Sequence, residues 1–207
     1  MIHDTAADTA AASLLATTAP EGTIDNLNLP WSFLTAIDVL LAHATTDNTR
    51  GAMTGILLER HAECTYLVAT DGYAALVLRT DALDGPPGTL VLDPASVRAW
   101  RARYDALTPW EEVSIDPHPA TGNYPNVRAV FPTPDRTGTS CVGISTKLLA
   151  RLGTVFRKLR LLKGVGEAVV MHIGSPLDAV VFSVHVPKEV EGPVRDLSCV
   201  LMPMRLV

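Results

Sequence analysis

Cysteine is scarce in this sequence, and long uncharged apolar runs are absent. The three cysteines, Cys64, Cys141 and Cys199, are an odd number and too few for a disulfide framework, which predicts a reducing compartment. Charged residues interrupt every apolar stretch before it reaches the ~18 residues that a membrane span needs. Residues 1–20 lack the basic start of a signal peptide. We therefore expect a cytoplasmic protein without a membrane segment.

Motifs for catalysis and cofactor binding are also missing. Neither a G-x-S-x-G nucleophile turn nor a Walker loop occurs. His61 and Cys64 have the spacing of two metal ligands, but no second pair accompanies them, so a zinc site is not expected. We expect a binding protein with no enzymatic activity, no metal and no cofactor. The enzyme alternative is a hydrolase or metal site built on cysteine and histidine, which titration with zinc or a thiol probe would test.

Positive charge is low overall but concentrated in one segment. The chain has 17 Lys+Arg against 22 Asp+Glu, a net charge of -5, which argues against a surface that holds nucleic acid everywhere. Residues 141–166 nevertheless contain six basic residues and no acidic one. On a helix, Lys147, Arg151 and Lys158 share a stripe suited to phosphate contact without base reading, supported by Arg98 and Arg101 on the preceding helix. The alternative is a solvated helix face that binds nothing.

Periodicity and turn residues predict two halves that each combine a helix with strands. A boundary near residues 110–123 is indicated because residues 108–139 contain six prolines. The first half is predicted to contain a helix from Pro30 to about Asn48, strands at 52–59, 65–70, 74–79 and 89–92, and a helix from Pro94 with Asp93 as N-cap. The second half is predicted to contain a strand at 140–144, a helix at 146–162 capped by Ser145, and strands at 168–173, 179–186 and 197–206. The Ala- and Thr-rich residues 1–23 are expected to form a mobile arm or weak helix.

Three short blocks carry a resemblance to a known family. Residues 67–73 read Leu-Val-Ala-Thr-Asp-Gly-Tyr, residues 124–132 read Tyr-Pro-Asn-Val-Arg-Ala-Val-Phe-Pro, and residues 200–206 read Val-Leu-Met-Pro-Met-Arg-Leu. They are similar, in the same order, to V-A-T-D-G-H, F-P-D-Y-R-R-V-L-P and V-V-M-P-M-R-L of the bacterial DNA polymerase sliding clamp, the beta subunit of the replicative polymerase. The resemblance covers most of residues 24–207, in a shortened form with no counterpart of the clamp's first domain.

The resemblance implies an α+β fold of the DNA-clamp type, with antiparallel sheets and helices on one side. It divides the chain into an arm (1–23), a first clamp-like unit (24–118) and a second unit (119–207). The implied function is that of an accessory factor of DNA replication or repair, which binds duplex DNA without sequence preference and peptide motifs of a polymerase or clamp loader. The alternative is an interaction protein, or decoy, that binds clamp partners without encircling DNA. A ring would require self-association into a dimer or trimer through sheet edges, although the domain that supplies half of the clamp's ring interface is missing.

The three blocks also imply a peptide-binding groove. The positions that match the clamp's groove are Met53, Thr70, Gly72, Pro125, Val130, Val200, Met202, Pro203, Met204 and Arg205. Methionine is flexible and polarizable, which suits a site that accepts several apolar anchors. Tyr73, Ala74 and Ala75 stand where the clamp has His, Arg and Leu, and Ala129 replaces an Arg, so the groove's size and charge are expected to differ. Without the resemblance, the same Met and Pro residues would be read as core packing.

Overall fold

The structure is a computed structural model that describes residues 14, 17–25, 27–30, 33–81, 83–104, 113–115, 123–130, 146–159, 170–173, 180–185 and 196–201. Its main element is a seven-stranded sheet in which every pair of neighbours is antiparallel. In spatial order the strands are β5 (Gly88–Leu92), β2 (Ile56–Arg60), β3 (Thr65–Thr70), β4 (Ala74–Thr80), β9 (Asp196–Leu201), β8 (Val180–His185) and β7 (Val170–Ile173). The two predicted halves meet where β4 pairs with β9, with Ala75 opposite Val200.

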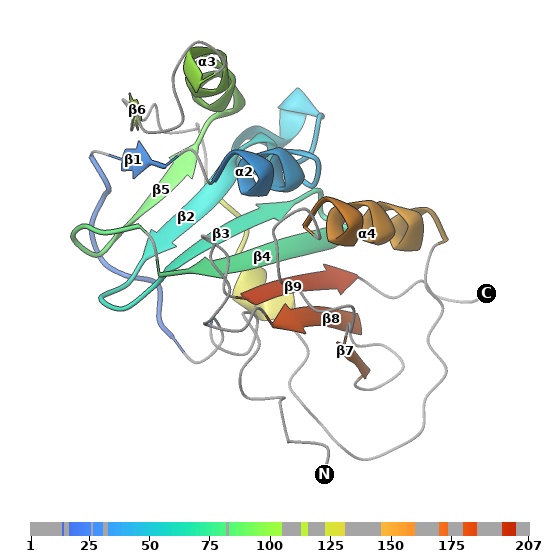
Figure 1. Ribbon diagram of the computed structural model, residues 1–207. Coiled ribbons are helices and arrows are strands. Elements are labelled where there is room, and N and C mark those ends of the chain that lie inside the picture. The colour runs from blue at the N-terminus through green and yellow to red at the C-terminus, as the bar shows by residue number, and fades with distance from the viewer. Residues whose placement is uncertain are drawn as a thin grey trace.

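Three helices cover one face of this sheet (Figure 1). They are α2 (Leu34–Leu41), α3 (Pro94–Tyr104) and α4 (Thr146–Leu159). Alternate strand residues such as Leu58, Leu67 and Leu76 are fully buried in one cluster with helix residues, among them Trp100 and Leu152. This period-2 pattern is what packs a sheet against a helix layer. The α+β class with helices on one side, predicted from the sequence, is confirmed.

The opposite face of the sheet is also apolar and buried. Leu57, Val68 and Val77 are offset by one residue from the helix-facing positions, so their side chains lie on this second face. They form a separate cluster together with Val127 and, from far along the chain, Leu14. Val127 begins the short 3-10 helix η4 (Val127–Val130). Because both faces are covered, β2, β3 and β9 are buried along their whole length.

Part of the N-terminal segment contacts the seven-stranded sheet. Leu14 is fully buried, and residues 22–24 lie parallel to the edge strand β5, with Ile24 N–H donating to Thr89 O and Thr89 N–H donating to Gly22 O. Residues 27–29 then form β1 (Leu27–Leu29), which pairs with β6 (Val113–Ile115) in a two-stranded sheet that the sequence did not predict. Leu14 and residues 22–24 thus contact the sheet, within the segment for which the sequence predicted a mobile arm or weak helix.

Two predicted element boundaries are wrong. The expected strand at 52–59 begins only at Ile56, because residues 48–54 form the 3-10 helix η3 (Asn48–Thr54). The Asp47 side chain accepts the Thr49 N–H at the start of η3, and Gly51 has φ +49°, a left-handed value that strands do not adopt. The helix expected from Pro30 to about residue 48 is the shorter α2, whose last turn is closed by Ala42 N–H donating to Asp38 O.

The remaining elements agree with the sequence prediction wherever the structure describes them. The helix at Pro94 starts as expected, with Asp93 Oδ1 accepting the N–H groups of Ala95 and Ser96 at 2.6 and 3.0 Å. The helix predicted at 146–162 is present as α4, and the strands predicted at 65–70, 74–79 and 89–92 agree to within one residue. The strand predicted at 140–144 lies outside the described residues.

Candidate functional site: an apolar groove behind a charged helix layer

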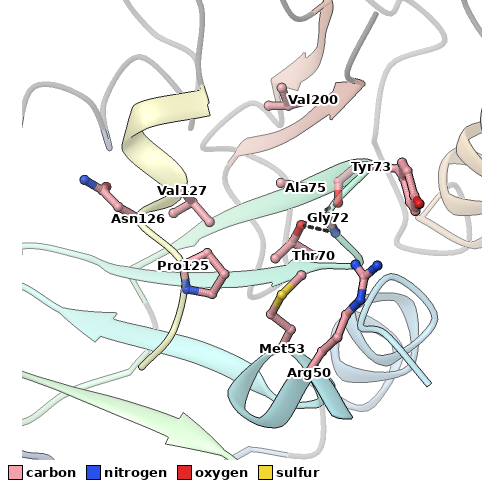
Figure 2. Close-up of a pocket in the computed structure, with 11 residues that line it drawn as sticks. Arg50, Met53, Thr70, Gly72, Tyr73, Ala75, Pro125, Asn126, Val127 and Val200 are labelled. Carbon is pink, nitrogen blue, oxygen red and sulfur yellow. Dashed lines mark hydrogen bonds between the residues drawn. The ribbon is translucent and has the colours of Figure 1, made fainter. Parts of the chain in front are cut away.

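An apolar hollow lies where η3, the β3–β4 turn, η4 and β9 converge (Figure 2). Its volume is about 330 Å3. The lining residues are Arg50, Met53, Thr70, Gly72, Tyr73, Ala74, Ala75, Pro125, Asn126, Val127 and Val200. We call this hollow the groove. Its floor is built by the buried strand residues Ala74, Ala75 and Val200, and its rim by exposed Tyr73 and Pro125.

The β3–β4 turn forms one wall of the groove and is fixed by Asp71. The Asp71 Oδ1 atom accepts the backbone N–H groups of Tyr73 and Ala74, both at 2.9 Å. Burial disfavours the charged form of Asp71, but these two hydrogen bonds and the Arg151 guanidinium outweigh it and hold the pKa of this carboxyl below its usual value. Gly72 follows with φ +88°, which favours glycine. The turn therefore has one defined shape.

Arg50 and Tyr73 give the groove a cationic and aromatic rim. Arg50 Nη1 donates to Asp71 O at 2.8 Å, and its guanidinium carbon lies 5.9 Å from the centre of the Tyr73 ring, within cation-π range. A Cβ on Gly72 would come within 2.8 Å of Arg50 Nη1, so a larger residue there would displace the end of the Arg50 side chain. Tyr73 is 62% exposed, and its ring is available to a ligand.

The opposite wall comes from η4 and the residues just before it. Pro125 and Asn126 are exposed, whereas Val127 is buried. Tyr124 donates its hydroxyl to Val68 O at 3.1 Å and so ties this segment to β3. Burial raises the pKa of Tyr124, which keeps the hydroxyl protonated as a donor. Proline and a tethered tyrosine together limit how far this wall can move.

Five of the ten groove residues predicted from the sequence line this hollow. They are Met53, Thr70, Gly72, Pro125 and Val200. The backbone of Val130 belongs to η4, but its side chain lies outside what the structure describes, as do Met202, Pro203, Met204 and Arg205.

Sequence reasoning missed Arg50, Asn126 and Val127 as lining residues. Asn126 and Val127 lie inside the second clamp-like block, where adjacency to Pro125 was a usable signal. Arg50 precedes the kink at Gly51 in an element that the sequence did not predict, so no sequence signal indicated it. These three residues add a cation, an amide and a buried aliphatic side chain to the site.

The helix layer carries the predicted basic residues, but they differ in availability. Lys147, Lys158 and Arg98 are exposed. Arg151 instead forms an ion pair with Asp71 and donates to Ala42 O. The backbone of Arg101 lies in α3, and its side chain is outside the described part. On α4, Lys147 and Lys158 are thus exposed to solvent, whereas the Arg151 side chain between them is bonded to Asp71 of the β3–β4 turn and to Ala42.

A second, polar hollow adjoins the groove and shares Arg50 and Tyr73 with it. Its volume is about 360 Å3, and Arg151, Asp71 and Asp47 are among its lining residues. Its two arginines are balanced by its two aspartates, so the hollow has no excess of charge. The Arg50 and Asp47 side chains lie 3.6 Å apart and are exposed, an arrangement that contributes little to stability.

Metal chemistry finds no support among the described residues. No group of three or more His, Cys, Asp or Glu side chains there could hold a metal ion. His61 and Cys64 share the β2–β3 connection, where His61 N–H donates to Cys64 O at 2.8 Å. No helix in the described ranges is long and apolar enough to cross a membrane.

Comparison with known proteins finds the fold but no sequence relative. No protein-family model matches the chain, and no curated protein matches it in sequence. Solved structures match over most of its length. The DNA polymerase III beta subunit of Thermotoga maritima is 12% identical with a TM-score of 0.65, covering 92% of this chain and 68% of the other. The sliding clamp of Pseudomonas aeruginosa, solved with a ligand, is 17% identical with a TM-score of 0.61, covering 90% and 68%.

A third match extends this agreement to another organism. The sliding clamp of Bartonella birtlesii, solved with griselimycin bound, is 14% identical with a TM-score of 0.60, and the match covers 92% of this chain and 69% of that one. Each match spans only about two thirds of the longer protein. The chain therefore has the fold of the bacterial DNA polymerase III beta sliding clamps.

Proposed function

We propose that this chain is a clamp-like accessory factor of DNA replication or repair that binds partner peptides in the groove and duplex DNA along its helix layer. We propose that it acts by binding, without catalysis. The observation that carries the proposal is the convergence of Met53, Thr70, Gly72, Pro125 and Val200 on one apolar hollow within a sliding-clamp fold. Val130 and residues 202–205 are proposed to complete the groove.

The chemistry of the groove suits short peptides with apolar anchors. A cavity of about 150 Å3 holds one benzene-sized group, and the groove has a volume of about 330 Å3. It therefore has room for two neighbouring apolar side chains. The short side chains of Ala74 and Ala75 leave space above the groove floor for an anchor. The flexible Met53 side chain can adapt to anchors of different shape. Tyr73 and Arg50 at the rim would contact the peptide beside its anchors.

A labelled peptide that carries a polymerase-type clamp-binding motif tests the groove. We expect an affinity of about 1 μM, or about -8 kcal/mol, measured by fluorescence anisotropy. Met53→Ala should weaken binding by about 1–3 kcal/mol, the usual cost of removing a buried anchor contact. Leu149→Ala is the matched control, because Leu149 is a 40% exposed apolar residue on α4 that does not line the groove. Equal affinities of the wild type and Met53→Ala would refute the assignment.

DNA binding is proposed to depend on the exposed lysines of α4. Lys147 and Lys158 carry the charge that neutralises phosphates, with Arg98 and Arg101 on α3 as further contacts. The double change Lys147→Glu and Lys158→Glu should abolish binding to a duplex of arbitrary sequence at low salt. The double change of both lysines to Arg keeps the charge and should keep the binding. Loss of binding in the Arg variant would contradict a contact that depends on charge alone.

The pairing of Arg151 favours a second candidate function, the decoy that binds clamp partners without encircling DNA. Because the Arg151 side chain is bonded to Asp71 and Ala42, the central cation of the predicted stripe is not free to contact phosphate. Light scattering with and without duplex DNA distinguishes the two functions. A 22.1 kDa monomer that binds the peptide but not DNA supports the decoy, whereas a larger species formed on DNA supports the clamp.

A further inference from the structure

The N-terminal segment is fixed to the back of the groove by one buried side chain and one turn. Leu14 has no exposed surface and belongs to the second-face cluster. Thr17 closes a turn on it, because its backbone N–H and its hydroxyl both donate to Leu14 O, at 3.2 and 2.9 Å. Residues 22–24 are held separately at the β5 edge. The segment is thus attached at two places on the sheet.

The Arg128 guanidinium adds a further link, which joins Leu14 and Thr17 to β2. Arg128 Nε donates to Leu14 O at 3.2 Å and to Thr17 O at 3.1 Å. Its Nη1 and Nη2 atoms donate to the two carboxylate oxygens of Glu59 at 2.8 and 2.5 Å. Glu59 is only 3% exposed, so its carboxylate would be left buried and unpaired if Arg128 moved away, which is energetically costly. Arg128 therefore ties the N-terminal segment and η4 to β2.

The second-face cluster that contains Leu14 also forms one side of the groove. Val127 and Val200 line the groove, and both belong to the buried cluster that contains Leu14. Arg128 is the next residue after Val127, so its four hydrogen bonds also fix the backbone that carries this wall. Neither Leu14 nor Arg128 lines the groove itself. They can affect a bound peptide only through the position of the wall.

We propose that Leu14 and Thr17 form a strap that fixes the groove wall, so that the groove binds peptide only when the strap is docked. This inference rests on the proposed peptide-binding function. With the strap released, the cluster that contains Val127 loses Leu14 and Arg128 loses two of its acceptors, which frees η4 to move. The apparent affinity of a ligand falls in proportion to the fraction of protein in the binding-competent state. Arg128 is accordingly a positioning residue for the groove.

The test compares two strap variants with two matched controls in the full chain. Leu14→Ala and Arg128→Gln should each weaken binding of the labelled clamp-motif peptide about tenfold, provided that circular dichroism shows a folded protein. Leu149→Ala and Arg157→Gln remove the same groups from exposed positions of α4 and should leave the affinity unchanged. Arg128→Lys keeps the charge without the forked geometry and should give an intermediate affinity. Wild-type affinity in both folded strap variants would overturn the proposal.

Amide hydrogen exchange keeps the proposal testable if a variant does not fold or if no peptide binds. Because coupling between sites is reciprocal, saturating the wild type with peptide should slow exchange at the Thr17 amide, which donates to Leu14 O, and unchanged exchange there would overturn the strap. If the wild type binds no peptide, the proposed function fails by itself. The strap is then judged by exchange at residues 124–130 in Arg128→Gln, where faster exchange supports it and unchanged exchange overturns it.

Discussion

Lowering the pH should destabilise this protein through one buried histidine. His43 follows α2, is 1% exposed, and has its Nδ1 atom 3.1 Å from Val39 O. Burial, and next the nearby Arg151 charge, lower the pKa of His43 from 6.5 to about 4, although the hydrogen bond to Val39 and the charge of Asp71 oppose this. The folded protein therefore keeps His43 neutral at pH values where the unfolded chain protonates it.

The size of the effect follows from the two pKa values. The contribution is fully present above pH 6.5, falls as the unfolded chain binds a proton, and levels off below about pH 4. At about 1.4 kcal/mol per pKa unit, the whole loss is about 3 kcal/mol, of which about 2 kcal/mol is reached at pH 5. That amount is a large part of the stability of an ordinary domain.

Urea unfolding at pH 7.5 and pH 5.0 measures this loss. The His43→Gln variant keeps an amide donor near Val39 O but cannot titrate, so it should lose about 2 kcal/mol less than the wild type between the two pH values. Other titrating groups contribute to both proteins and cancel in the comparison. If both proteins lose the same free energy of unfolding, the reasoning is refuted. NMR titration of the His43 ring in the wild type gives an independent check, since a pKa near 6.5 would refute it as well.

Three further predictions concern single groups. Glu59→Gln should lower the free energy of unfolding in urea by about 3 kcal/mol, because it breaks a buried ion pair, whereas the exposed Glu63→Gln should leave it unchanged. Asp93→Ala removes the N-cap of α3 and should cost about 1 kcal/mol in the same assay; no change would show that the cap is redundant. Iodoacetamide followed by peptide mass spectrometry should label Cys64 in the native protein but not Cys199, because burial raises the pKa of the Cys199 thiol to about 12; native labelling of Cys199 would contradict its burial.

Local signals in the sequence predicted the elements that depend on local chemistry. The Asp93 cap followed by Pro94 located the start of α3, and the turn at Asp71 and Gly72 located the β3–β4 hairpin. η3 was missed because the apolar residues after Ala52 look like one strand. Gly55, just before β2, lies so close to Leu92 that an added Cβ would be 2.2 Å from Leu92 O, so this position requires glycine. That crowding is visible only once β5 is paired with β2.

Contacts between distant residues explain what the sequence could not predict about the site. The blocks around Thr70, Pro125 and Val200 were identified by resemblance, and all three blocks contribute residues to one hollow. Leu14 looked like an isolated apolar residue in an Ala- and Thr-rich segment, but its carbonyl accepts from Arg128, 114 residues away. Arg151 looked like a free cation on a helix stripe, but its partner Asp71 is 80 residues away. No local pattern specifies such pairs.

The parallel contact of residues 22–24 with β5 limits how this sheet can grow. An edge strand normally presents N–H and C=O groups that another chain can pair with. At the β5 edge, both outward groups of Thr89 are already used by Gly22 and Ile24 of the same chain. Another molecule could extend the sheet there only by displacing these hydrogen bonds. The chain thus protects its own β5 edge against pairing with other molecules. A second copy that added a strand at this edge would compete with residues 22–24 of the same chain.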